Sequence, residues 1–294
     1  INTTFYKIIY TPKSQNQAVL SSDVNITSTT NTFNSSSINN NVLSSLTVSG
    51  SGTTTLNGSV TTSGTQSFTG PVTLGAASTL TTTDNNITFS NTVNGGFGLT
   101  VGAGTGTTTF SGAVGGTSAL TSLSVTGTGT TSIGGGSITT SGTQTYSGPV
   151  SLSADTSFTT TNNNLTFNGT VNSSNSTARD LTASVGTGSV VFGDSSSDTV
   201  GATNAIKAIS ITGGLDLNAA ITSATSLSVS GASDLGANVT TSGTQTYTGA
   251  ITLSGADRTL TGSTITNSST ITGAGFSLTE TGNAVINGAV SGVN

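Results

Sequence analysis

Charged residues make up only 5% of this 294-residue chain, against roughly 25% in ordinary soluble domains. The net charge is −5 with five Lys and Arg residues, which argues against nucleic acid and anionic membrane surfaces as partners. Cysteine and histidine are absent, so disulfides, thiolate or imidazole metal sites and histidine-based triads are excluded. No apolar run of 18 or more residues occurs, and we expect no transmembrane helix.

Residues 1–45 differ from the rest of the chain. Residues 4–10, TFYKIIY, join aromatic and β-branched residues into a β-prone segment. Residues 31–45 are rich in Asn and Ser. We predict that 1–45 is a separate N-terminal segment, acting as a cap or as a strand donated to another subunit.

A long motif returns three times in the remaining chain. It reads TTSGTQSFTGPVTL at 61–74, TTSGTQTYSGPVSL at 139–152 and TTSGTQTYTGAITL at 240–253. Both separations divide into steps near 20 residues, which is typical of a solenoid. We expect Phe68, Tyr146 and Tyr247 to share one register and form an aromatic ladder inside the coil.

Short strands with period-2 alternation make up each repeat. In the coil from Leu46, we expect Leu46, Val48, Thr54, Leu56 and Val60 to fall on one face. No apolar stripe of helical period appears, and Thr, Val, Ser and Gly are poor helix formers. We therefore predict an all-β fold, a right-handed parallel β-solenoid with about 20 residues per coil, over residues 46–294.

These repeats resemble the β-helical shafts of bacterial surface adhesins, of the filamentous haemagglutinin and autotransporter-passenger type. The resemblance covers residues 46–294 and rests on the SGTQ(T/S)(Y/F)xG(A/P)(V/I)xL repeats and the short Gly-punctuated strands. It implies an extracellular or cell-surface β-helix used for attachment or as a stalk. An NPN-type secretion motif and a translocator barrel are not apparent.

Some parallel β-helices are polysaccharide lyases and hydrolases, so we also looked for paired acids. A glycosidase needs two carboxylates about 5 to 10 Å apart, which in a solenoid means one register on neighbouring coils. Asp84 and Asp155 are several coils apart, and we predict no enzyme and no cofactor. Two carboxylates within reach on adjacent coils would favour this alternative.

Two further charged stretches have simpler interpretations. The GDSSSD loop around Asp194 and Asp198 lacks the repeat and the bidentate Glu of known calcium loops, so we predict a solvated turn rather than a Ca²⁺ site. We predict a surface turn for Arg179 and Asp180, with a local ion pair or a lyase-like cation as the alternatives.

The two ends suggest a function. An open solenoid end exposes strand edges that can pair with another chain. We predict an extracellular structural protein that forms a fibre or stalk head to tail; the alternative is an adhesin segment binding a cell-surface or glycan target. The predicted inter-subunit residues are Phe5, Tyr6, Ile8, Ile9, Tyr10, Val285, Ile286 and Val290.

Overall fold

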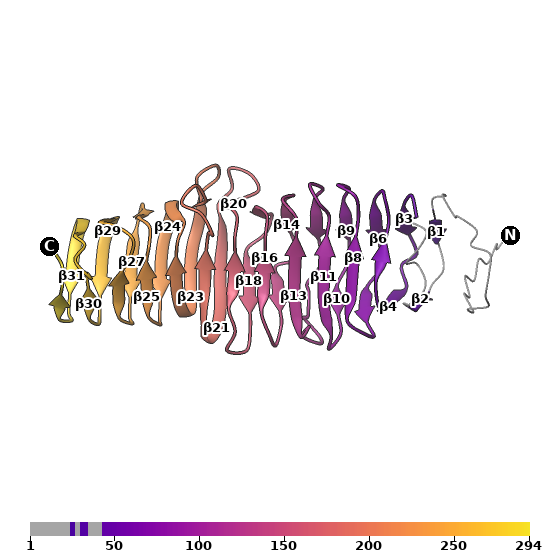
Figure 1. Ribbon diagram of the computed structural model, residues 1–294, viewed down its shortest axis with the longest axis horizontal. Coiled ribbons are helices and arrows are strands. Elements are labelled where there is room, and N and C mark those ends of the chain that lie inside the picture. Colours follow the sequence, from indigo (N-terminus) through magenta and orange to yellow (C-terminus); the bar gives the residue numbers. More distant parts are fainter. Residues whose placement is uncertain (1–23, 27–29, 35–42) are drawn as a thin grey trace.

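The computed structural model describes residues 24–26, 30–34 and 43–294. These residues form an all-β rod of parallel stacked strands, a β-solenoid of about 12 turns with roughly 21 residues per turn. The strands lie across the long axis, with β1 (Val24–Ile26) towards one end and β31 (Leu278–Ile286) at the other (Figure 1). The predicted fold class, a parallel β-solenoid, is confirmed.

Each turn contributes to three ladders of parallel strands, which we name faces A, B and C in the order in which the chain visits them. Face A contains β1, β3 (Leu46–Val48), β6 (Gln66–Phe68), β9 (Ile87–Phe89), β12 (Thr108–Phe110), β14 (Thr131–Ile133), β17 (Val150–Leu152), β20 (Val171–Ser173), β22 (Thr199–Val200) and β26 (Val239–Thr241). Face B contains β2 (Thr30–Asn34), β4 (Thr53–Asn57), β7 (Val72–Leu74), β10 (Val93–Asn94), β15 (Ser137–Thr139), β18 (Thr156–Thr159) and β27 (Thr244–Tyr247). Face C contains β5 (Val60–Thr61), β8 (Ser78–Thr81), β11 (Gly98–Gly102), β13 (Ser122–Thr126), β16 (Gln144–Tyr146), β19 (Leu165–Phe167), β25 (Ser233–Leu235), β28 (Ile251–Leu253), β30 (Ile271–Thr272) and β32 (Val290–Ser291).

Five longer strands run round a corner and serve two faces. They are β21 (Arg179–Phe192) and β23 (Ile206–Leu217) on faces B and C, and β24 (Ala220–Val229), β29 (Arg258–Asn267) and β31 on faces A and B. Near β20, turns project beyond the outline of the rod (Figure 1).

Alternate residues of each strand point into the core. The five residues expected on one side of the strands all point inward and are fully buried, although they are spread over faces A, B and C: Leu46, Val48, Thr54, Leu56 and Val60. This burial confirms the alternation. Because a parallel ladder keeps register, each inward side chain lies on its counterpart about 4.8 Å away in the next turn. Burial of such side chains is worth about 1.5–3 kcal/mol each and is the main source of stability.

Aromatic residues stack inside the rod, but in two separate columns. On face A, Phe89 stacks between Phe68 and Phe110, with ring centroids 5.5 and 5.2 Å apart. On face C, Phe167 stacks on Tyr146 at 5.3 Å, and also on Phe192. Offset stacking at these distances adds about 0.5–1.5 kcal/mol per pair beyond burial.

The expectation of one shared register for the three motif aromatics is wrong. All three are buried inside, as predicted, but Phe68 pairs into face A, Tyr146 into face C and Tyr247 into face B. Neither separation between the copies is therefore a whole number of turns. The three copies of the motif therefore lie on three different faces of the rod.

The parallel ladders extend into the segment that we assigned to 1–45. β1 pairs with β3, and β2 pairs with β4, with Phe33 opposite Leu56. The described part of this segment thus continues the same ladders. Its residues 1–23, 27–29 and 35–42 lie outside the described residues.

Candidate functional site

The repeated motif forms a buried polar corner centred on a glutamine. Gln144 Nε2 donates to Ile138 O at 3.2 Å, to Thr140 Oγ1 at 3.3 Å and to Thr159 O at 2.9 Å. Its two copies repeat these contacts: Gln66 with Val60, Thr62 and Thr81, and Gln245 with Val239, Thr241 and Thr261. The glutamine satisfies carbonyls at a bend, and one of those carbonyls belongs to the next turn.

Threonine and glycine complete this corner. Thr140 Oγ1 donates to Gly142 O at 2.6 Å, which closes the bend locally. A Cβ on Gly142 would lie 2.3 Å from Thr121 O of the turn below, so only glycine fits this approach. The other copies have the same constraint, with Gly64 against Ser44 O and Gly243 against Thr225 O.

Asparagine and aspartate side chains link successive turns elsewhere. Each accepts a backbone N–H from the next turn at 2.8–3.1 Å, which satisfies that donor. The aspartates with this role are Asp84, Asp155, Asp180 and Asp257, and the asparagines include Asn86, Asn162, Asn164 and Asn238. Asp84 and Asp155, the two acids considered above as a catalytic pair, therefore each have a structural partner.

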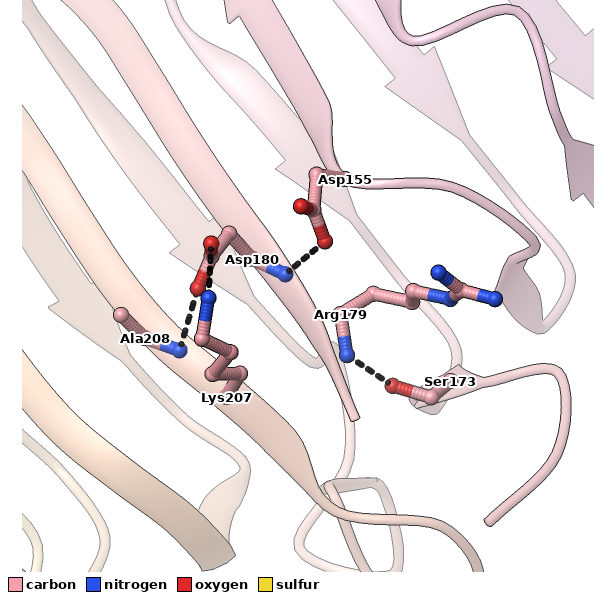
Figure 2. Close-up of polar contacts among 6 residues, drawn as sticks. All are labelled: Asp155, Ser173, Arg179, Asp180, Lys207 and Ala208. Carbon is pink, nitrogen blue, oxygen red and sulfur yellow. Dashed lines mark hydrogen bonds and ion pairs between the residues drawn. The ribbon is translucent and has the colours of Figure 1, made fainter. Parts of the chain in front are cut away.

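Figure 2 shows one such column with its charges. Asp180 N donates to Asp155 Oδ1 at 3.0 Å, and Asp180 Oδ1 accepts from Ala208 N at 3.1 Å. Asp180 Oδ2 also pairs with Lys207 Nζ at 2.8 Å, and this carboxylate raises the pKa of Lys207 through its hydrogen bond and charge. The Lys207 side chain is 58% exposed, so the ion pair adds little stability.

The predicted surface turn at Arg179 and Asp180 is wrong, because both residues lie in β21. A local ion pair between them is absent as well. Asp180 pairs with Lys207, 27 residues away, while the Arg179 side chain extends away from that carboxylate (Figure 2). Arg179 N donates to Ser173 Oγ at 2.9 Å.

Asp194 and Asp198 lie in the turn between β21 and β22, with Asp198 N donating to Ser195 O at 3.1 Å. Among the described residues, no group of three or more Asp, Glu, His or Cys side chains could hold a metal ion.

The same residues include no helix that is long and apolar enough to cross a membrane.

One acidic pair meets the adjacent-coil condition that the sequence left open. Asp216 lies opposite Asp234 in the pairing of β23 with β25 on face C. Burial, and then the charge of Asp234, raises the pKa of Asp216, while the hydrogen bond from Asn218 lowers it. Arg258 Nε donates to the neighbouring Leu235 O at 3.0 Å. Sequence reasoning missed this pair, although both acids occur in similar D-L dipeptides.

The C-terminal turn places predicted inter-subunit residues around an open hollow. Ile286 and Val290 are each 48% exposed, although the residues that they pair with in the preceding turn, Asn267 and Ile271, point inward and are buried. Val285 is half-buried and lies opposite Thr266. The hollow has a volume of about 330 Å³ and is lined by Ile271, Leu278, Glu280, Ala284, Ile286, Val290, Val293 and Asn294.

Glu280 is the residue that the sequence prediction missed at this end. It is the only glutamate in the chain, and it stands in LTE where earlier repeats have LTV at Leu46 and Leu99. This departure from the repeat pattern could have been recognised in the sequence. The predicted partners Phe5, Tyr6, Ile8, Ile9 and Tyr10 lie outside the described residues.

Comparison with known proteins adds no assignment. No family model, no curated protein and no solved structure matches the chain.

Proposed function

We propose that this chain is an extracellular structural protein, a solenoid shaft that builds a fibre or stalk by head-to-tail stacking of turns between subunits. The C-terminal turn carries this proposal. Within the described part of the chain, β31 pairs only with β29, and β32 only with β30. A further parallel strand added to this turn would cover the half-exposed inward side chains Ile286 and Val290.

A further solenoid turn, supplied by a second copy of the chain, would cover these strands and side chains. Parallel β-augmentation supplies main-chain hydrogen bonds, and alternate side chains supply specificity. A head-to-tail contact between copies does not close, so it produces an open fibre. The β-prone residues 4–10 of a second copy, with Phe5, Tyr6, Ile8, Ile9 and Tyr10, are the proposed incoming strand.

Removal of residues 1–13 tests this proposal. We expect the purified full chain to form fibres above a threshold concentration, seen by electron microscopy and sedimentation, and the deleted chain to remain a monomeric rod. Circular dichroism should show the same β content in both, and Lys13→Ala serves as a full-length control. Monomers at every concentration, or fibres from the deleted chain, would contradict the proposal.

A monomeric rod that binds cells or glycans with or without residues 1–13 would instead support an adhesin segment. The extracellular location rests on the resemblance to adhesin shafts and on the lack of cysteine, which is compatible with an oxidising compartment.

The pair Asp216 and Asp234 favours a second candidate, a carbohydrate-active β-helix. Neighbouring turns are about 4.8 Å apart, close to the 5–5.5 Å carboxylate separation of retaining glycosidases. Burial raises the pKa of half-buried Asp216, which suits a general acid, and exposed Asp234 lies opposite it. Cleavage of a polysaccharide by the full chain, lost in Asp216→Asn but kept in Asp194→Asn, would establish this candidate, and no cleavage would remove it.

A further inference from the structure

Glu280 breaks an apolar column inside the rod. The inward ladder on face A runs through Val200, Ile221, Val239 and Leu260 before it reaches Glu280 in β31. The four apolar residues are almost completely buried. A carboxylate at an inward position is costly unless it is paired or hydrogen-bonded. Its presence in the last described turn therefore needs a partner.

Asn267 supplies only part of that partner. It is 1% exposed, and its Nδ2 donates to Glu280 Oε1 at 2.5 Å. Asn267 Oδ1 and Glu280 Oε2 are both buried and have no hydrogen-bond partner among the described residues. Both atoms are acceptors, so the group lacks a donor. Burial raises the pKa of Glu280, while the Asn267 bond lowers it.

The residues around Glu280 indicate what kind of molecule could supply the missing hydrogen-bond donor. Glu280 lines the open hollow together with apolar residues, among them Leu278, Ile286 and Val290. A fitting occupant would carry apolar side chains and one positively charged donor. An extended strand meets this description when its charge falls on the inward face.

We propose that Glu280 and Asn267 form a recognition site for a lysine, Lys7 of a second copy of this chain, and so set the register of the added strand. Residues 4–10 join apolar side chains with one cation. Phe5 and Lys7 are two positions apart, as are Leu278 and Glu280. A parallel strand with Phe5 over Leu278 therefore places Lys7 over Glu280. This inference rests on the proposed head-to-tail assembly.

The proposed pair of Lys7 and Glu280 can be tested by exchanging the two charges. Removing one partner of a buried charge pair leaves the other uncompensated, which costs far more than the pair itself contributes. Each single substitution should therefore damage assembly more than an exchange of both charges.

The experiment compares Lys7→Glu, Glu280→Lys and the double variant, with Lys13→Glu as the matched charge control. We expect each single variant to raise the threshold concentration for fibres at least about tenfold, and the double variant to return it to within about threefold of the original. Lys13→Glu should leave the threshold unchanged. If Glu280→Lys folds poorly by circular dichroism, Lys7→Met with Glu280→Leu replaces the ionic pair by an apolar one and should also restore fibres.

The outcomes separate the two proposals. Normal fibres from Lys7→Glu, combined with monomers from the 1–13 deletion, would overturn the lysine site and keep the assembly. Failure of both paired variants to restore fibres would overturn the site as well. Normal fibres from the deleted chain would overturn the assembly itself.

Discussion

The corners around Gln66 and Gln144 have nearly the same sequence, yet only one satisfies its buried amide fully. At the second corner, Tyr146 O–H donates to Gln144 Oε1 at 3.4 Å. At the first corner Phe68 occupies the tyrosine position, and Gln66 Oε1 is buried without a partner. A single hydroxyl thus decides whether the motif leaves an unsatisfied acceptor in the core.

The third copy agrees with the second. Tyr247 O–H donates to Gln245 Oε1 at 3.1 Å, although this corner lies on another face. An unsatisfied buried acceptor costs about 1–3 kcal/mol. The comparison therefore predicts that the three corners respond differently to the same substitution.

Removal of the glutamine should have the largest effect. We expect Gln144→Ala to lower the free energy of unfolding by about 2–4 kcal/mol, because the hydrogen bonds from both Nε2 hydrogens are lost, the Tyr146 hydroxyl loses its acceptor and a cavity remains. Gln66→Ala should cost about 1 kcal/mol less, since it also removes an unsatisfied oxygen. Urea unfolding followed by circular dichroism measures both.

The matched control is Thr145→Ala, which lies between Gln144 and Tyr146 but faces outward in the strand. It should change stability by less than about 0.5 kcal/mol. An equal loss from Gln66→Ala and Gln144→Ala would show that the hydroxyl is not what distinguishes the corners.

Sequence alternation sufficed to predict the strands and the core, but not the face on which each motif lies. Period 2 places Gln144 and Tyr146 on one side of the strand, so an inward glutamine was readable. The face was not, because the corner contacts only its own residues and the adjacent turns, such as Thr159 O. The same contacts can form at any of the three bends.

The charged residues show a different limit. Arg179 and Asp180 are neighbours in sequence, but adjacent strand residues point to opposite sides. Asp180 instead meets Lys207, which the pairing of β21 with β23 brings near. That pairing depends on the longer turns around β22. The alternation of inward and outward residues does not predict how long those turns are. Asp216 and Asp234 differ from this case, because no such long turn separates them and they pair directly in neighbouring turns, so the repeat spacing alone was enough to bring them together.

Deletion of the tyrosine hydroxyl should have an intermediate effect. We expect Tyr146→Phe to cost about 1–2 kcal/mol at neutral pH, because it leaves Gln144 Oε1 in the condition of Gln66 Oε1. Burial raises the pKa of Tyr146, so the unfolded chain ionises first above about pH 10 and the wild type loses stability there. The gap between the two proteins should therefore narrow as the pH rises past 10. A gap that is constant with pH would contradict this account.

The reciprocal change, Phe68→Tyr, should have the smallest effect and the opposite sign. The added hydroxyl would give Gln66 Oε1 a donor and stabilise the protein by about 1 kcal/mol. Phe68 stacks on Phe89 much as Tyr146 stacks on Phe167, with centroids 5.5 and 5.3 Å apart, so the ring position already accommodates tyrosine in the second copy. Urea unfolding of Phe68→Tyr beside Phe89→Tyr, whose hydroxyl has no glutamine two residues before it, separates the hydrogen bond from the added volume. A loss of stability in both variants would mean that overpacking outweighs the new bond. A gain confined to Phe68→Tyr would show that the first corner lacks only this donor.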